Sequence, residues 1–75
     1  MTDSQVMALL YDRATVEMDG FVINSWFDDS TSEKNIELVW KNPLREVGFI
    51  ANGMTPAELK ERLEMEIRAW EMVRK

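Results

Sequence analysis

The reactive groups available to this chain are carboxylates, lysine amines, hydroxyls and one tyrosine, because its 75 residues include neither histidine nor cysteine. Histidine is the usual proton carrier near neutral pH, and cysteine is a strong nucleophile that shares most zinc sites with histidine. Glu17, Glu37 and Glu46 fall in segments with strand-like alternation, and Lys41 and Arg45 flank a turn. Two such carboxylates could form the acid–base pair of a glycosidase, in which one carboxyl group keeps a raised pKa.

Enzymatic activity is nevertheless not expected, because a carboxylate pair acts only in a cleft that holds the substrate. One small sheet rarely encloses a pocket of roughly 300 Å³ or more. The chain also lacks a glycine-rich phosphate loop, a Gly-x-Ser-x-Gly elbow and a Ser-x-x-Lys pair. The acidic stretch at residues 28–33 lacks the ligand spacing and central glycine of an EF-hand, which favours a solvated turn. We therefore predict no catalytic residues, no metal site and no cofactor.

Size and charge narrow the class of partner. We expect one domain, residues 1–75, and a chain of this length buries only about 60% of its unfolded surface. Because no disulfide can form, self-association or a partner that covers apolar surface is a remaining source of stability. The net charge is −5, and residues 1–33 carry seven acidic residues against Arg13 alone. This acidity disfavours binding to nucleic acid and to anionic membranes.

The chain carries no recognisable membrane or export signal. It has no run of 18 apolar residues and no basic N-terminal stretch followed by an apolar segment, so neither a transmembrane helix nor a signal peptide is expected. The absence of cysteine fits a reducing compartment. We expect a cytoplasmic location, in the producing cell or in an infected host. The small size and acidic charge suggest an inhibitor or adaptor encoded by a virus or mobile element.

Two helices are predicted, one near each end of the chain. The C-terminal helix begins at a capping box, Thr55-Pro56-Ala57-Glu58, and runs from Pro56 to about Arg74. Its apolar residues recur at helical spacing: Leu59, Leu63, Ile67, Trp70 and Val73. The N-terminal helix begins near Thr2-Asp3-Ser4-Gln5, and one side of it carries Val6, Leu9, Leu10 and Ala14. A helix of about ten residues is marginal by itself, so it must pack on the rest of the domain.

The segments between the helices alternate with a period of two, which predicts strands at about 14–18, 21–27, 35–41 and 45–51. Asp19-Gly20 predicts a two-residue hairpin turn. In that hairpin Met18 opposes Phe21 and Val16 opposes Ile23, so the apolar side chains share one face. The expected architecture is α+β with the order α-β-β-β-β-α. It is an antiparallel β-meander with both helices on one face of the sheet.

A three-stranded alternative remains open. If the Asp19-Gly20 turn does not form, the first two strands merge and the order becomes α-β-β-β-α. That order is similar to the topology of double-stranded RNA-binding domains, which grip phosphates with lysines at the start of their last helix. The corresponding stretch here, residues 55–61, is net acidic. The likeness is therefore one of topology, and RNA binding is not expected.

Large apolar residues remain on the sheet face that the helices are not expected to cover. They are Val22, Trp26, Val39 and Ile50. A sheet covered on one side normally has a polar outer face, so these residues predict a binding surface. Three alternatives stay open: the four residues are isolated on the surface, the loop at 28–34 covers them, or the strand register is shifted by one residue.

A second candidate surface lies on the C-terminal helix. Met65, Ala69 and Met72 have the spacing i, i+4 and i+7, which places them away from the main apolar stripe. Methionine suits adaptable contact surfaces, and these residues could support antiparallel helix pairing in a homodimer. Alternatively, the N-terminal helix covers them, or they are ordinary surface residues.

These observations favour a non-enzymatic protein–protein interaction module. Its partner is expected to be another protein or a second copy of the chain, in a homodimer. Its expected anchors are Val22, Trp26, Val39 and Ile50, with Met65 and Met72 as secondary contacts. The alternative is an acidic mimic of nucleic acid that occupies the basic groove of a nucleic-acid-binding enzyme. Direct binding to nucleic acid or to a membrane is not expected.

Overall fold

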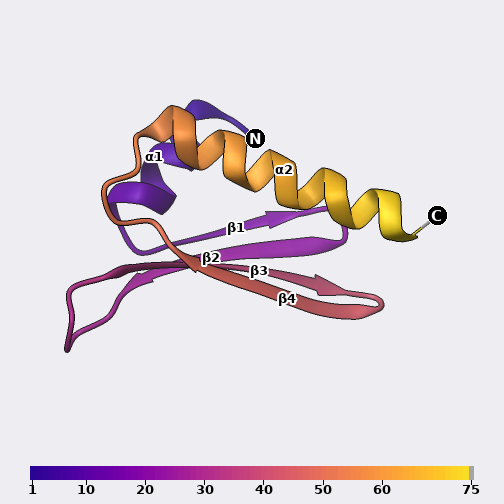
Figure 1. Ribbon diagram of the computed structural model, residues 1–75, viewed down its shortest axis with the longest axis horizontal. Helices are drawn as coiled ribbons and strands as arrows, with labels where there is room; N and C mark the ends of the chain where they lie inside the picture. Colours follow the sequence, from indigo (N-terminus) through magenta and orange to yellow (C-terminus); the bar gives the residue numbers. More distant parts are fainter. Residues whose placement is uncertain (75) are drawn as a thin grey trace.

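Six elements follow one another in the predicted order α-β-β-β-β-α (Figure 1). The computed structural model describes residues 1–74. The elements are α1 (Asp3–Tyr11), β1 (Ala14–Met18), β2 (Phe21–Phe27), β3 (Lys34–Lys41), β4 (Leu44–Ile50) and α2 (Pro56–Arg74). Neither helix has both the length and the apolar character that a membrane-crossing segment needs, as far as residues 1–74 are concerned. The α+β fold class predicted from the sequence is confirmed.

Both helices begin at a capping box. The Gln5 amide donates to Thr2 Oγ1 at 3.2 Å, and the Thr2 amide donates to Gln5 Oε1 at 2.9 Å. Thr55 and Glu58 repeat this exchange at the start of α2, at 3.2 and 3.0 Å. Each pair satisfies two backbone donors that a helix start would otherwise leave free. Helix α1 ends at Tyr11, so Ala14 does not belong to its apolar side; Ala14 begins β1, which agrees with the strand predicted at 14–18.

The sheet is a four-stranded antiparallel meander with the order β1-β2-β3-β4. Met18 lies opposite Phe21 and Val16 lies opposite Ile23, which confirms the predicted hairpin register. Gly20, the second residue of the Asp19-Gly20 turn, has a φ of +90°, a conformation that glycine adopts without steric cost. The three-stranded alternative is therefore wrong.

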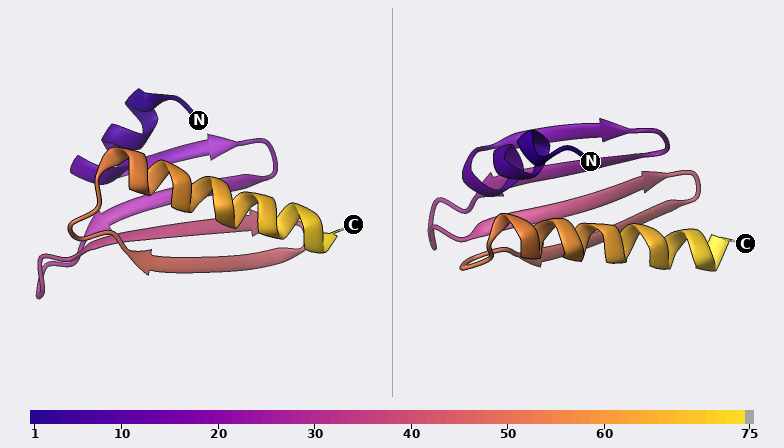
Figure 2. Two further views of the ribbon diagram at one scale, coloured as in Figure 1. Left: turned by 45° about the horizontal axis from the view of Figure 1, so that its top comes forward. Right: turned by 90° about the horizontal axis from the view of Figure 1, so that it is seen from above.

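Both helices cover the same face of the sheet, as Figure 2 shows, with α1 over β1 and β2. The core lies between these layers. Trp40 on β3 is 2% exposed and packs between Phe21 of β2 and Trp70 of α2, at ring-centroid distances of 5.8 and 5.9 Å. The predicted stripe of α2 is buried at Leu59 and Leu63. Val73, expected to continue that stripe, is exposed because it lies in the last turn of the helix, after Trp70, which still packs against the core.

Two polar residues point into the covered face at one end of the sheet. Lys34 is only 4% exposed, although the sequence placed it in a polar loop, and Ser25 is also buried. Lys34 Nζ and Ser25 Oγ both donate to the carbonyl oxygen of Asp12, the residue that caps the end of α1. The Lys34 ammonium also lies 4.0 Å from the centre of the Phe27 ring. Lys34 thus ties the end of α1 to the sheet, where the helix dipole favours a positive charge.

Burial lowers the pKa of Lys34 from its ordinary value of 10.5; nearby Asp12 opposes this shift and Arg13 adds to it. Between the lowered pKa and 10.5, the unfolded chain holds a proton at this amine that the folded protein has lost. Stability therefore rises with pH across that window. We expect the free energy of unfolding of the parent, relative to Lys34→Met, to increase between neutral pH and pH 10.5.

Urea unfolding of both proteins across this range measures the effect. Methionine keeps an unbranched apolar stem but cannot titrate, so the contributions of all other groups cancel in the difference. A difference that stays constant or shrinks as pH rises would contradict this account of Lys34.

Candidate protein-interaction surface

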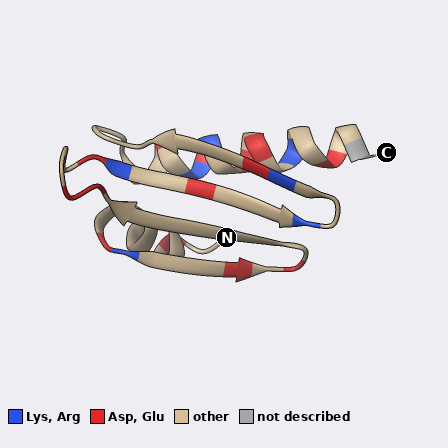
Figure 3. Cartoon of the chain, turned by 90° about the horizontal axis from the view of Figure 1, so that it is seen from below, with Lys and Arg blue, Asp and Glu red and all other residues tan. Residues whose placement is uncertain are grey.

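The sheet face opposite the helices is called the open face here. It consists of the outward-pointing strand residues, and Figure 3 looks onto it with both helices behind the sheet. All four expected primary anchors lie on it, because they alternate along their strands with buried or partly buried core residues. The open face comprises Thr15, Glu17, Val22, Asn24, Trp26, Asn35, Glu37, Val39, Lys41, Leu44, Glu46, Gly48 and Ile50. The register is therefore not shifted by one residue.

The strand register arranges the four anchors as two pairs. Val22 and Val39 face each other across β2 and β3. Trp26 and Ile50 are both partners of Asn35, which lies between them on β3. A polar row separates the two pairs and contains Thr15, Asn24, Glu37 and Gly48. The anchors therefore form a valine pair and a Trp26–Ile50 pair, rather than one continuous apolar patch.

The Trp26–Ile50 pair borders a shallow hollow of about 450 Å³. Trp26 is 39% exposed and Ile50 is 48% exposed, while Val22 and Val39 are half-buried. The hollow is lined by Trp26, Asn35, Ile36, Gly48, Phe49 and Ile50. Gly48 contributes no side chain, so the surface dips beside Ile50. This hollow can accept an apolar side chain from another molecule and bury it against the indole ring.

Charge on the open face is mostly negative. Glu17 and Glu46 are at the two ends of the row that holds the valine pair, and Glu37 lies in the polar row next to it. Among the described strand residues, Lys41 is the one basic side chain on this face, beside the turn into β4. Glu37 accepts a long hydrogen bond of 3.5 Å from the Asn24 amide. The face therefore combines apolar side chains with carboxylates that point toward solvent.

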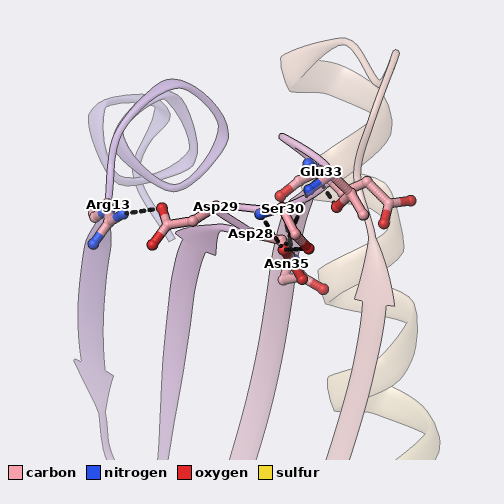
Figure 4. A network of polar contacts seen from close by, with 7 residues as sticks. Arg13, Asp28, Asp29, Ser30, Glu33 and Asn35 are labelled. Atoms are coloured by element: carbon pink, nitrogen blue, oxygen red, sulfur yellow. Dashed lines mark hydrogen bonds and ion pairs between the residues drawn. The ribbon is translucent and has the colours of Figure 1, made fainter.

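The acidic loop at residues 28–33 leaves Trp26 39% exposed. The Asp28 carboxylate folds back on its own loop and accepts hydrogen bonds from the Ser30 hydroxyl at 2.7 Å and the Ser30 amide at 2.9 Å (Figure 4). These bonds, the one from the hydroxyl first, lower the pKa of Asp28. Asp29 lies 3.3 Å from the Arg13 guanidinium. The loop is a turn organised by its own side chains, as its composition predicted.

The two secondary anchors lie apart from the open face. Met65 and Met72 are on the outer side of α2, on the helical layer that covers the other face of the sheet. Both side chains are more than half exposed, so α1 does not cover them. The structure thus brings Val22, Trp26, Val39 and Ile50 onto one face and leaves Met65 and Met72 on a separate surface.

Sequence reasoning overlooked the residues that shape the hollow, Asn35 and Gly48. The signal that identifies them is the pairing of β3 with β4, in which Gly48 lies opposite Glu37 and Asn35 lies opposite Ile50. That register follows from the two-residue connection at Asn42 and Pro43.

Comparison of the chain with protein-family models, with curated proteins and with solved structures found no match.

Proposed function

We propose that the protein is a non-enzymatic interaction module that binds another protein through its open face. The observation that carries this proposal is the exposure of Trp26 and Ile50 around a hollow, on a sheet face that neither helix covers. Tryptophan contributes strongly to binding when it is buried in an interface and is costly to leave in water. A domain this small also gains stability from a partner that covers its leftover apolar surface.

Binding through this face gives the protein the role of an inhibitor or an adaptor. As an inhibitor, the domain would cover a surface of the bound protein that normally contacts other molecules. As an adaptor, it would bring the bound protein close to a molecule held by another surface of the domain. We place this activity in the cytoplasm of the producing cell or of an infected host, where the absence of cysteine is no disadvantage. An origin in a virus or mobile element belongs to the same proposal.

The acidic-mimic alternative has one observation in its favour, namely the three glutamates on the open face. Glu17 and Glu46 lie three strand spacings apart, about 14 Å, which is sparse for an imitation of phosphates. The acids of the N-terminal half are also dispersed. Asp3 lies 3.6 Å from Lys60, and Asp29 pairs with Arg13 on another part of the surface. The interaction-module proposal therefore has the stronger support.

Photo-crosslinking from the open face tests the proposal. We expect benzoylphenylalanine at position 26 to form a covalent adduct with one protein in the native host cells, because the ring replaces the exposed indole. The same probe at Met7, an exposed apolar residue on α1, is the matched control. Identical adducts from both positions, or none from position 26, would contradict docking at the open face. Complete loss of the adduct in high salt would favour the mimic, since the apolar contacts of an open-face interface persist when ionic strength screens the charges.

A further inference from the structure

We propose that the open face receives an extended protein segment in which apolar residues flank a lysine or arginine at two-residue spacing. This inference rests on the proposed function and adds the chemistry of the partner. The segment has the pattern apolar-x-basic-x-apolar. Its first apolar side chain enters the hollow between Trp26 and Ile50, its basic side chain reaches Glu37, and its second apolar side chain covers the valine pair.

The spacing of the open-face rows supports this pattern. Trp26, Asn24 and Val22 are successive outward residues of β2 and belong to three successive rows. Outward residues of a strand are about 6.7 Å apart, and an extended partner laid along the strands repeats at the same distance. Residues i, i+2 and i+4 of the partner therefore lie over the hollow, the polar row with Glu37, and the valine pair in turn.

The charges of the open face select a basic partner. Among residues 1–73, whose side chains the structure describes, the ion pairs involve Arg13, Lys60 and Arg62, and none of them includes Glu17, Glu37 or Glu46. Covering these carboxylates with an apolar or acidic surface would remove them from water without a counter-charge, at a considerable cost. A lysine or arginine offsets that cost and also accelerates association by electrostatic attraction.

The same charges disfavour a second copy of the chain as the occupant. A two-fold axis that stacks the valine pair of one copy on that of another has two simple directions. An axis along the strands places Glu17 of one copy over Glu46 of the other. An axis across the strands places Glu17 over Glu17 and Glu46 over Glu46. Both arrangements bury like charges together, so the homodimer expected from the sequence requires a different surface.

Titration of the labelled protein with three short peptides, followed by amide and indole NMR shifts, tests the inference. The first peptide contains Leu-Thr-Lys-Thr-Leu, the second replaces the lysine with glutamate, and the third has the first composition in the order Leu-Leu-Thr-Thr-Lys. We expect the first peptide to shift the Trp26 indole and the Asn35 and Gly48 amides more strongly than the others. Glu37→Gln should weaken this binding about threefold. Glu61→Gln, which removes the same charge from the exposed side of α2, should leave it unchanged.

The outcomes separate this inference from the function on which it rests. If the glutamate peptide binds as well as the lysine peptide, or if Glu37→Gln has no effect, the basic partner is wrong and the open face remains a docking surface. Absence of open-face shifts with all three peptides also overturns the inference, and crosslinking from position 26 then decides the function by itself. A dimer detected by light scattering and lost in Trp26→Thr would establish a second copy as the occupant instead.

Discussion

Trp40→Ala is expected to lower the free energy of unfolding by about 3–5 kcal/mol. Trp40 is central to the core, because its ring lies between Phe21 and Trp70 and so joins β2, β3 and α2. Truncation removes the indole and leaves a cavity that the surrounding layers cannot fill. A core in a domain of this size rarely supplies more than about 3–5 kcal/mol in total. The variant should therefore be largely unfolded at room temperature, as measured by circular dichroism.

Two further variants serve as controls for the Trp40→Ala prediction. Leu44→Ala shortens an exposed apolar residue on the neighbouring strand and should change the stability by less than about 0.5 kcal/mol. Trp40→Phe keeps an aromatic ring and should lose less stability than the alanine variant. The phenylalanine variant should therefore remain folded, so that its stability can be measured by urea unfolding. If the Trp40→Ala protein were as stable as the Leu44→Ala protein, the packing of the sheet against α2 through the Trp40 ring would be contradicted.

Trp26→Thr is expected to weaken binding to the protein captured from position 26 by about 30-fold or more, since a buried tryptophan anchor contributes about 2 kcal/mol or more. Threonine retains the preference for a strand, and Trp26 is already partly exposed, so the folded state should lose only about 1 kcal/mol. Isothermal titration calorimetry measures the affinity, and urea unfolding measures the stability. The effect on binding is thus much larger than the effect on folding.

Met7→Gln and Met65→Gln are the matched controls for that prediction. Both remove an exposed apolar side chain from a helix and replace it with a residue of similar helix propensity. Neither should change the affinity if the partner docks on the open face. A larger loss of affinity from Met65→Gln than from Trp26→Thr would show that the partner binds the outer side of α2 instead of the open face.

Local patterns explain why most of the fold could be predicted. Thr55 and Glu58 indicate the start of α2 through a reciprocal pair of hydrogen bonds that depends on neighbouring residues alone. Asp19 and Gly20 determine the first hairpin, because the turn type sets the strand register. The side of the sheet on which Val22 lies follows from that register. These features need no knowledge of the tertiary structure.

The features that sequence reasoning overlooked depend on contacts between distant segments. Lys34 at the start of β3 is buried where its ammonium group donates to the Asp12 carbonyl oxygen at the end of α1. The two residues are 22 positions apart, so no local sequence pattern predicts this contact. The separation of the valine pair from the Trp26–Ile50 pair depends on the register of three strands together. Alternation alone places a residue on one face of a sheet. Its neighbours on that face come from the pairing of the strands.

Cross-saturation NMR on the complex with the captured partner tests the open-face assignment most directly. The chain is deuterated except at its valine, isoleucine and methionine methyl groups, and the protons of the unlabelled partner are irradiated. We predict signal loss at Val22, Val39 and Ile50, with little change at Met65 and Met72. Signal loss confined to the methionines of α2, with the open-face methyl groups unaffected, would contradict the account.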